Sequence, residues 1–520
     1  MSISKLIKEL ITYARFHLHL EELDEMYKRN ELLAKFKCNV FIDEEIDKEK
    51  IKAMDVPDEL VEEIKEVIKE NNICPLEEEE IFITEIFGLL SPLPSVINYK
   101  FNEIAKENKT NACNYLYDLS IKNWYIKKSA ISKNIKWNYI DEDNQNSLEI
   151  TINLSKPEKN NKDIQKLLTL KKDASKYPQC LLCYENEGYK GTLTHPARKN
   201  IRTIDLTLNG ENWFMQYSPY AYYNEHCIVI NKEHKPMNID ETTPRKLVDF
   251  IDYLPNYFIG SNASLPIVGG SILNHEHFQG GNYTLPMFNS SYKEIYYSED
   301  FPSLKIGILN WYNSTIKFEG TNKEELFGFA KRIIDTWRDF NYEECSILSH
   351  SGSTPHNVIT PVLRKENGKY AFYFILRNNR TNEEYPDGIF HVHKEYFNIK
   401  SEGIGLIEAM GLFILPPRLK REFALIEDIL LTNKYDEEIN NDNHPLYKHR
   451  AMVKDLLDIK KYGNRAEANE QIKLYTSKVC KNILGNTAVF KQDEVGQKGF
   501  KVFLSSLGLK KANYYINFKF

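Results

Sequence analysis

Gly-Gly-Ser-Ile-Leu-Asn-His-Glu-His-Phe-Gln-Gly-Gly, at residues 269–281, is the stretch on which the fold and the chemistry both depend. From Leu265 to Gln279 the sequence is an apolar stretch bounded by glycines, and it ends in alternating polar and apolar residues. This pattern predicts a β-strand over residues 265–279. Because side chains alternate along a strand, His275, His277 and Gln279 are expected on one face. The flanking glycines permit positive φ angles and a close approach of the backbone to a bulky ligand such as a pyrophosphate.

His277 is the candidate nucleophile. A histidine with the usual pKa of about 6.5 is mostly neutral at neutral pH, so a ring nitrogen can attack phosphorus without a separate base. The bond formed is reactive, so one difficult displacement becomes two easier ones. Gln279 could donate a hydrogen bond to a phosphoryl oxygen. The alternative is that two histidines on a half-buried strand satisfy local polar groups or bind a structural metal.

Cys180 and Cys183 form the one Cys-x-x-Cys pair among eight cysteines. This spacing lets two thiolates bind a single tetrahedral ion, and histidines must complete the site. His275 and His234 are candidates, and His226 competes with His234. A closed site of this kind is structural, with zinc as the expected metal. A redox pair is the alternative, but it expects a thioredoxin-like βαβ setting that the sequence does not show.

Size and charge narrow the class of protein. With 520 residues, the chain is expected to form two or more packed units. A net charge of -6 and the lack of a long Lys/Arg block argue against nucleic-acid and membrane partners. The N-terminus has no apolar signal core, and the apolar stretch near residues 403–417 is too short to span a bilayer. We therefore expect a cytoplasmic protein.

The hydrophobic pattern predicts an α+β fold. Helical periodicity is expected at 4–36, 58–70, 101–119 and 326–340, strands within 213–231 and at 369–377, and three further helices beyond 420. The division expected is a mostly helical region over 1–170, two central parts over 171–325 and 326–420, and a helical region over 421–520. Nine of the thirteen histidines fall between residues 195 and 393, so the chemistry is expected there.

Four motifs resemble the galactose-1-phosphate uridylyltransferases of the longer bacterial type. They are Cys-Leu-Leu-Cys at 180–183, Tyr-Tyr-Asn-Glu-His-Cys-Ile-Val-Ile-Asn at 222–231, the stretch at 269–281, and Pro-His-Asn-Val-Ile-Thr-Pro-Val at 355–362. The resemblance runs from about residue 175 to 420 and implies a pair of histidine-triad-like α+β units. It also implies that His277 takes a uridylyl group from UDP-glucose, releases glucose 1-phosphate, and passes the group to galactose 1-phosphate to give UDP-galactose.

The resemblance also implies roles for individual residues. Cys180, Cys183, His234 and His275 match the family's zinc ligands. The phosphate-binding and substrate-binding positions correspond to Asn262, Gly270, Ser271, Asn274 and Gln279. Independently of the resemblance, Arg198 and Arg202 lie close in sequence and could anchor a diphosphate or sugar phosphate.

The second half of the resemblance implies a possible second metal site. His356, His391 and His393, together with Glu294, resemble a second site found in some members, which could hold iron or zinc. Glu276 replaces the proline that the shorter form has between the two histidines, and it is expected to point away from the phosphate. The resemblance also suggests a homodimer.

Two other functions remain open from the sequence. One is a dinucleoside polyphosphate phosphorylase, which would use the same His-x-His-x-Gln motif and form an adenylyl intermediate. The other is a zinc-stabilised nucleotide-binding module without turnover.

Overall fold

The computed structural model describes residues 2–155, 177–270, 272–432 and 437–512. The chain forms two compact units. Unit 1 comprises residues 1–133, 157–235 and 275–277, and unit 2 comprises residues 134–156, 236–274 and 278–520. The chain passes from unit 1 to unit 2 inside one strand, between His277 and Phe278. The four-part division expected from the sequence stays a prediction, and its boundary near 170 lies outside the described residues.

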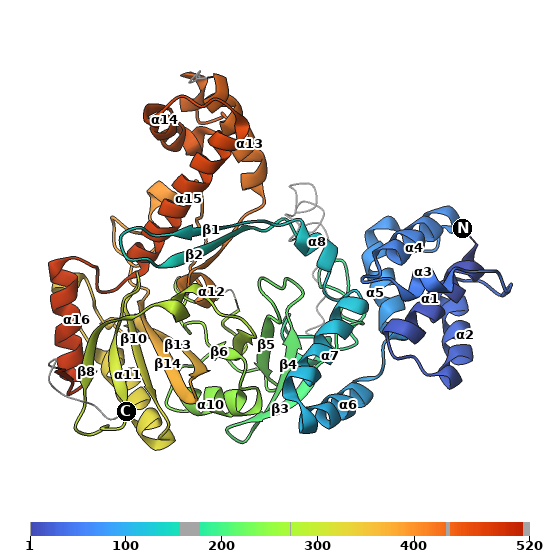
Figure 1. Cartoon of the computed structure of the whole chain (residues 1–520), viewed down its shortest axis with the longest axis horizontal. Helices are drawn as coiled ribbons and strands as arrows, with labels where there is room; N and C mark the ends of the chain where they lie inside the picture. Colours follow the sequence, from blue (N-terminus) through green and yellow to red (C-terminus); the bar gives the residue numbers. More distant parts are fainter. Residues whose placement is uncertain (1, 156–176, 271, 433–436, 513–520) are drawn as a thin grey trace. The chain divides into compact units, whose positions relative to one another are not determined.

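The first part of unit 1 is helical, as the sequence predicts (Figure 1). Its helices are α1 (Ile3–His17), α2 (Glu25–Lys35), α3 (Lys48–Lys52), α4 (Asp58–Asn71), α5 (Glu79–Leu90), α6 (Pro94–Glu107), α7 (Lys109–Lys122) and α8 (Lys128–Ser132). The Ser2 hydroxyl caps α1 by accepting the N–H of Lys5 at 3.1 Å. The helix expected over 4–36 is divided, because His19 has a φ of 56° and cannot continue the helix.

Unit 1 also contains a three-stranded antiparallel run in the order β3-β4-β5. The strands are β3 (Ile204–Leu208), β4 (Glu211–Tyr217) and β5 (Cys227–Asn231). Asn209 and Gly210 join β3 to β4, and both have positive φ angles, of 48° and 76°. A two-residue turn of this kind matches the right-handed twist of the strands it connects. The hairpins confirm the strands predicted within 213–231 and place Asn231 at the end of β5.

Unit 2 is built on an antiparallel sheet in the order β16-β8-β9-β10-β14-β13-β6-β7 (Figure 1). The strands are β6 (Phe258–Gly260), β7 (His277–Gly281), β8 (Tyr292–Tyr297), β9 (Lys305–Leu309), β10 (Thr315–Gly320), β13 (Asn357–Glu366), β14 (Lys369–Asn378) and β16 (Lys510–Lys511). Phe318 and Phe372 are opposite each other in β10 and β14, and their rings stack at 5.1 Å. This sheet and the surrounding helices confirm the α+β class.

Helices α10 (Thr243–Tyr253) and α11 (Lys323–Asp339) pack against β13, and α11 confirms the helix predicted over 326–340. Trp337 of α11 is 1% exposed and donates its indole N–H to the carbonyls of Val358 and Arg377, each at 3.1 Å. The interior hydrogen bonds fix the helix against the β13–β14 pair.

The strand expected over residues 265–279 is wrong for most of its length, because β7 begins only at His277. Asn274 and His275 lie in a bend. The Glu276 N–H donates to the Lys235 carbonyl at 2.7 Å, so the backbone just before β7 pairs with a loop. The glycines before it serve packing, since a Cβ on Gly269 would lie 2.2 Å from the Ala263 carbonyl oxygen.

The C-terminal part of unit 2 contains the three helices predicted beyond residue 420, followed by a fourth that the sequence reading missed. They are α13 (Arg418–Thr432), α14 (Arg450–Ile459), α15 (Arg465–Thr487) and α16 (Glu494–Ser506). A smaller sheet of β1 (Ile135–Ile140), β2 (Ser147–Ile152) and β15 (Leu412–Leu415), following the short helix α12 (Leu406–Ala409), lies beside α15 (Figure 1). Trp137 of β1 donates to the Ser477 hydroxyl of α15 at 3.0 Å.

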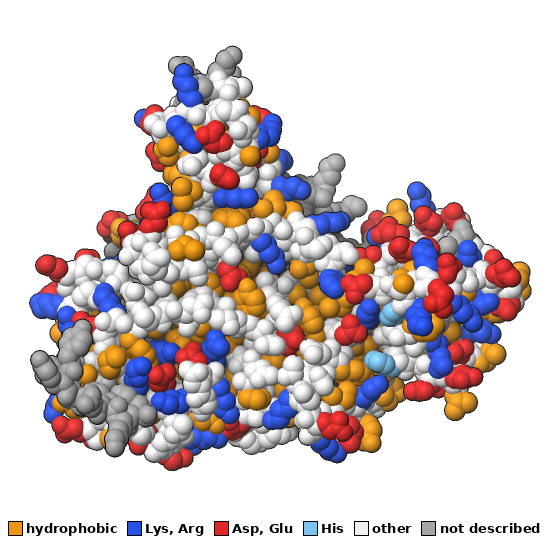
Figure 2. Space-filling view, in the orientation of Figure 1, with side chains coloured by type: hydrophobic (Ala, Val, Ile, Leu, Met, Phe, Trp, Pro, Cys, Tyr) orange, Lys and Arg blue, Asp and Glu red, His pale blue; other side chains and the backbone are white. Residues whose placement is uncertain are grey.

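No single helix in the described ranges is long and apolar enough to cross a membrane; the stretch 76–90 and α6 pass that test only as a pair bent by 57°. On the face drawn in Figure 2, acidic and basic side chains alternate over the N-terminal helices.

One carboxyl pair in unit 1 makes stability depend on pH. Burial, and then the nearby charge of Glu9 on α1, raises the pKa of Glu63 on α4 to about 7 from 4.5. A folded-state pKa above the unfolded value means that the folded protein holds this proton more tightly. The stabilisation is therefore present below about pH 4.5 and is lost as the pH rises through about 7.

We predict that Glu63→Gln, which mimics the protonated carboxyl, raises the thermal midpoint at pH 8 and leaves it unchanged near pH 5. Thermal unfolding at both pH values measures this. Glu62→Gln is the matched control, because Glu62 is an exposed neighbour paired with Lys65 at 2.7 Å. Equal effects of the two substitutions at pH 8 would contradict the assignment.

Arg202 has a structural role that corrects the sequence expectation of a phosphate anchor. Its side chain is buried, and it donates from Nη2 to the Gly88 carbonyl in the last turn of α5 at 3.2 Å and from Nε to the Pro92 carbonyl just beyond the helix at 2.5 Å. Its Nη1 donates to the Ile201 carbonyl at 2.7 Å. The cation thus satisfies orphan carbonyls at the negative end of the helix dipole.

We predict that Arg202→Met lowers the free energy of unfolding by about 2–4 kcal/mol, because it leaves buried helix-end carbonyls without donors. Denaturant-induced unfolding measures the change. Arg198→Met is the control: its side chain is half-buried and donates only to the adjacent Ala197 carbonyl, so its effect should stay below about 1 kcal/mol. A stable Arg202→Met variant with weakened substrate binding would restore the anchor role.

Candidate active site and metal centre

Four side chains of unit 1 form a group that could hold a metal ion: Cys180, Cys183, His234 and His275, with ligand atoms all within 4.8 Å of one another. The two sulfurs are 3.6 Å apart. The Cys180 Sγ–His275 Nδ1 and Cys183 Sγ–His234 Nδ1 distances are 3.2 and 3.1 Å, and Cys183 Sγ–His275 Nδ1 is 3.8 Å. Tetrahedral ligands at ordinary bond lengths are about 3.4–3.8 Å apart, so the group fits one tetrahedral ion after small shifts.

Surrounding groups orient these ligands. The Nε2–H of His275 donates to the Asn231 carbonyl at 2.8 Å, which leaves the Nδ1 lone pair for a metal. Backbone N–H groups of Cys180 and Leu182 donate to the cysteine sulfurs at 3.3 Å each. The group is therefore built to hold an ion, with the hydrogen bonds that metal ligands usually make to their surroundings.

The cysteine turn has its own support, which the sequence reading missed. The Asn186 amide donates to the carbonyls of Cys180 at 2.9 Å and Cys183 at 2.8 Å. The Asn186 Oδ1 in turn lies 2.7 Å from Nε2 of His195. An asparagine three residues after the second cysteine is the signal that could have suggested this clamp.

The structure also decides between the two histidines that the residues alone left open. His234 belongs to the four-residue group, whereas the ring of His226 packs against Tyr222 and Tyr223 with centroids 5.4 and 4.6 Å away. His234 is held near the cysteines because it lies in the loop that follows β5.

His277 is the first residue of β7 and is 6% exposed. Its Nδ1 donates to the carbonyl of His275 at 2.8 Å, which puts the proton on Nδ1 and the lone pair on Nε2. Burial lowers the pKa of the ring to about 4, so the ring is uncharged at neutral pH. The arrangement has the tautomer that attack through Nε2 requires.

Glu276, between the two histidines, is buried and faces other partners. Its Oε2 accepts from the Asn231 amide at 3.0 Å and pairs with Lys235 at 3.3 Å. Lys235 also pairs with Glu211 of β4 at 2.9 Å. These contacts fix the bend before β7, and they give Glu276 a structural role.

The other predicted substrate-binding residues lie in β7 and in the segments before it. Gln279 follows His277 by two positions in β7, so both side chains lie on one strand face. Asn262 and Gly270 of unit 2 meet, because a Cβ on Gly270 would lie 2.8 Å from Asn262 Nδ2. Asn274 is exposed in the bend before β7, and Ser271 lies outside the described residues.

The expected second metal site is not assembled. Glu294, His356, His391 and His393 form no metal-binding group among the described residues. His356 bonds to Asn379 and Ser351 at 2.8 Å each, and His393 Nε2 lies 3.1 Å from the Ile389 carbonyl. Glu294 accepts from Tyr296 at 2.6 Å and pairs with Lys511 at 3.0 Å. These residues make hydrogen bonds or ion pairs with other neighbours, so we propose no second metal.

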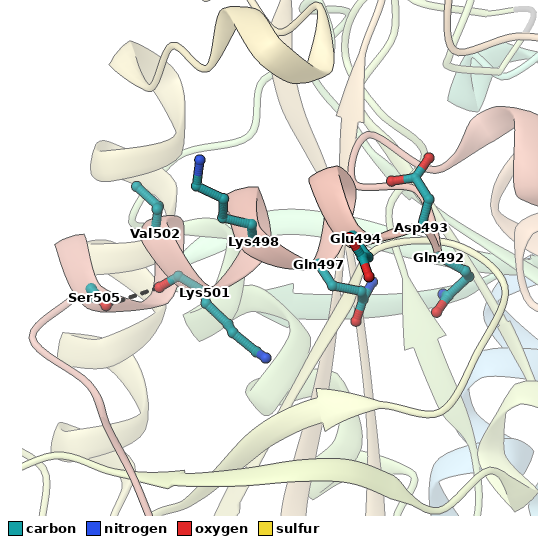
Figure 3. Close-up of a pocket in the computed structure, with 8 residues that line it drawn as sticks. All are labelled: Gln492, Asp493, Glu494, Gln497, Lys498, Lys501, Val502 and Ser505. Carbon is teal, nitrogen blue, oxygen red and sulfur yellow. Dashed lines mark hydrogen bonds between the residues drawn. The ribbon is translucent and has the colours of Figure 1, made fainter.

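An open groove of about 650 Å³ runs along α16, and its lining includes none of the residues singled out above (Figure 3). Its lining mixes the acids Asp493 and Glu494 with the lysines Lys498 and Lys501. It contains no histidine or cysteine and offers no candidate nucleophile.

Known proteins are similar to this chain along nearly all of its length. The model of the galactose-1-phosphate uridyl transferase N-terminal domain matches residues 19–236, and that of the C-terminal domain matches residues 250–444. A galactose-1-phosphate uridylyltransferase of Clostridium acetobutylicum is 43% identical over 504 residues, which is 96% of this chain and 99% of the relative. That of Caldanaerobacter subterraneus is 42% identical over 517 residues, covering 97% and 98%.

A solved structure of yeast Ap4A phosphorylase in complex with AMP aligns with a TM-score of 0.32 at 11% identity, covering 64% of this chain and 92% of that one. A similarity this low carries no argument. The two domain models and the nearly full-length relatives do: the chain belongs to the galactose-1-phosphate uridylyltransferase family.

Proposed function

We propose that this protein transfers a uridylyl group from UDP-glucose to galactose 1-phosphate, giving glucose 1-phosphate and UDP-galactose. Family membership supports the reaction, because the relatives are named for it along 96% or more of this chain. The observation that carries the mechanism is the hydrogen bond from His277 Nδ1 to the carbonyl of His275, whose own ring belongs to the metal-binding group.

The first displacement begins with the Nε2 lone pair of His277 attacking the α-phosphorus of UDP-glucose. The bond from this phosphorus to the bridging oxygen breaks, and glucose 1-phosphate leaves with the electron pair. The ring then carries a positive charge, which the Nδ1–H bond to a carbonyl oxygen helps to disperse. In the second displacement a phosphate oxygen of galactose 1-phosphate attacks the same phosphorus and releases the neutral ring.

The neighbouring residues have supporting roles in this proposal. Gln279 donates to a phosphoryl oxygen as charge develops there, without exchanging a proton itself. Asn262, Gly270 and Asn274 contact the substrate phosphates or sugar. Arg198, whose half-buried guanidinium lies 5.7 Å from the Tyr125 ring centroid, supplies positive charge.

We further propose that the ion in the cysteine-histidine group is zinc with a structural role. Two thiolates and two imidazoles in a closed tetrahedral arrangement are the usual ligands of structural zinc. With all four positions taken by protein, no ligand position is left for substrate. The ion would stabilise the bend at His275 and, through the next two residues, the orientation of His277. The homodimer and the cytoplasmic location stay predictions from the sequence.

We predict that His277→Gln forms no uridylyl adduct when incubated with UDP-glucose, whereas the unsubstituted protein gains one uridylyl group by intact mass. Exchange of labelled glucose 1-phosphate into UDP-glucose should fall by at least about 10³-fold, because the exchange requires the covalent intermediate. His356→Gln is the control, since His356 bonds to Asn379 and Ser351 outside the metal-binding group. An adduct on His277→Gln, or loss of its metal, would refute the nucleophile.

We predict one zinc ion per chain in the purified protein, and loss of that ion in Cys183→Ala. Structural zinc can contribute on the order of 10 kcal/mol to folding, so the thermal midpoint should fall sharply in this variant. Metal analysis by mass spectrometry and thermal unfolding measure the two effects. His226→Gln should retain the ion, because His226 lies outside the group; zinc loss in that variant would shift the ligand assignment.

A further inference from the structure

Arg377 of β14 is a buried cation that the protein leaves largely without partners. Its side chain is 1% exposed, and Nη2 donates to the Ile404 carbonyl at 2.8 Å. Its Nε and Nη1 are buried and have no hydrogen-bond partner among the residues that the structure describes. Burial lowers the pKa of the guanidinium to about 10, so it remains charged at neutral pH.

Three other buried cations of the described residues have their partners within the chain. Lys400 pairs with Glu408 at 2.8 Å, and Lys317 pairs with Glu366 at 2.7 Å. Arg202 binds a helix end through several carbonyls. A buried charge without an opposite charge is destabilising, so an isolated arginine at this depth calls for an anionic partner from outside the chain.

The residues around Arg377 include the segment already proposed to bind phosphate. Val358 and Arg377 are opposite each other in β13 and β14, so their side chains share one sheet face. On that face Val358 packs in one cluster with Ala263 and Val268, against which Leu265 and Ile267 also pack. The segment 263–268 therefore covers the face from which Arg377 projects.

A second segment, Gly403 to Leu406, connects Arg377 to Asn262. Arg377 donates to the carbonyl of Ile404, and the Leu406 N–H donates to Asn262 Oδ1 at 2.8 Å. A Cβ on Gly403 would lie 2.9 Å from the Ile267 carbonyl oxygen and 3.9 Å from His391 Nε2. The amide of Asn262 and the cation of Arg377 are thus held at the two ends of one short loop.

The covering segment is also strained. Ile267 has a φ of 74°, in the left-handed region that a β-branched residue rarely adopts. Such strain persists where the surroundings require it, and it reduces the cost of moving the segment when a ligand enters.

We propose that Arg377 binds a phosphate group of the sugar-nucleotide substrate beneath the 262–270 segment, donating from the two N–H positions, Nε and Nη1, that have no partner in the described part of the chain. The identity of the phosphate rests on the proposed function. The negative charge of the ligand then compensates the guanidinium, and movement of the 263–268 segment gives it access. Arg377 thereby replaces Arg202 as the buried arginine that meets the substrate.

The test compares Arg377→Met and Arg377→Lys with the unsubstituted protein. Calorimetry at fixed ionic strength gives affinities for UDP-glucose and for uridine, which lacks phosphate. Arg377→Met should weaken UDP-glucose binding ten- to a hundredfold and change uridine binding less than twofold, as expected for loss of hydrogen bonds from a charged donor. Arg377→Lys should recover part of the loss, because it restores the charge but not the guanidinium geometry.

Thermal unfolding of the ligand-free protein separates binding from a structural role. Arg377→Met removes an uncompensated buried charge, so its midpoint should equal or exceed that of the unsubstituted protein. A lower midpoint together with equal losses for uridine and UDP-glucose would overturn the proposal. Arg364→Met is the matched control on β13: its half-buried guanidinium lies 4.6 Å from the Phe288 ring centroid, and both affinities should stay unchanged.

Inorganic pyrophosphate distinguishes failure of this inference from failure of the proposed function. It should raise the midpoint of the unsubstituted protein and not that of Arg377→Met. Equal shifts in both, or no shift in either, would overturn the role of Arg377 even if UDP-glucose forms the His277 adduct. Conversely, a shift that depends on Arg377 without any adduct would retain the anion site and reject the transfer reaction.

Discussion

The convergence of the cysteine turn at 180–183 with His234 and His275 is the constraint on which the candidate site depends. These residues are far apart in sequence, and their ligand atoms lie within 4.8 Å of one another. His275 contributes three contacts at once: Nδ1 to the sulfurs, Nε2 to the Asn231 carbonyl, and its own carbonyl to His277. One residue therefore links the metal-binding group to β5 and to the ring of the proposed nucleophile. A change at the metal would reach His277 through a single backbone carbonyl.

The two buried arginines illustrate how environment sets the role of a residue type. Burial lowers the pKa of both Arg202 and Arg377 to about 10. Arg202 spreads its charge over carbonyls at the end of α5, whereas Arg377 has a single carbonyl acceptor. Proteins commonly retain a buried polar group without a partner where a bound ligand supplies the missing hydrogen bond. The ligand-free protein is less stable as a result. The difference lies in the partners and not in the depth of burial.

The same reasoning separates two of the three His-x-His pairs in the sequence, at residues 275 and 277 and at residues 391 and 393. In the first, His275 and His277 are joined by a ring-to-carbonyl hydrogen bond, and one of them reaches the cysteines. In the second, the Nδ1 of His391 lies 3.2 Å from the Val392 carbonyl, and the His393 ring stacks on Tyr385 at 4.4 Å. Equal spacing in sequence thus produced one convergent group and one pair of locally satisfied rings. Long-range contacts decide which outcome occurs, because a ligand set needs side chains from several segments.

The sequence by itself determined the features that depend on local pattern. The helices of the N-terminal region, the strands within 213–231 and at 369–377, the α+β class and the membership of Cys180, Cys183 and His275 in a metal-binding group all follow from periodicity, turn chemistry and ligand spacing. Ligand spacing left His226 and His234 open, and the family resemblance indicated His234, which the structure places in the group. Only the tertiary structure decided the late start of β7 at His277, the helix-end role of Arg202 and the isolation of Arg377. The physical reason is that each of these depends on which distant carbonyl, sulfur or carboxylate comes within hydrogen-bonding or ligand distance, and residue spacing along the chain carries no such information.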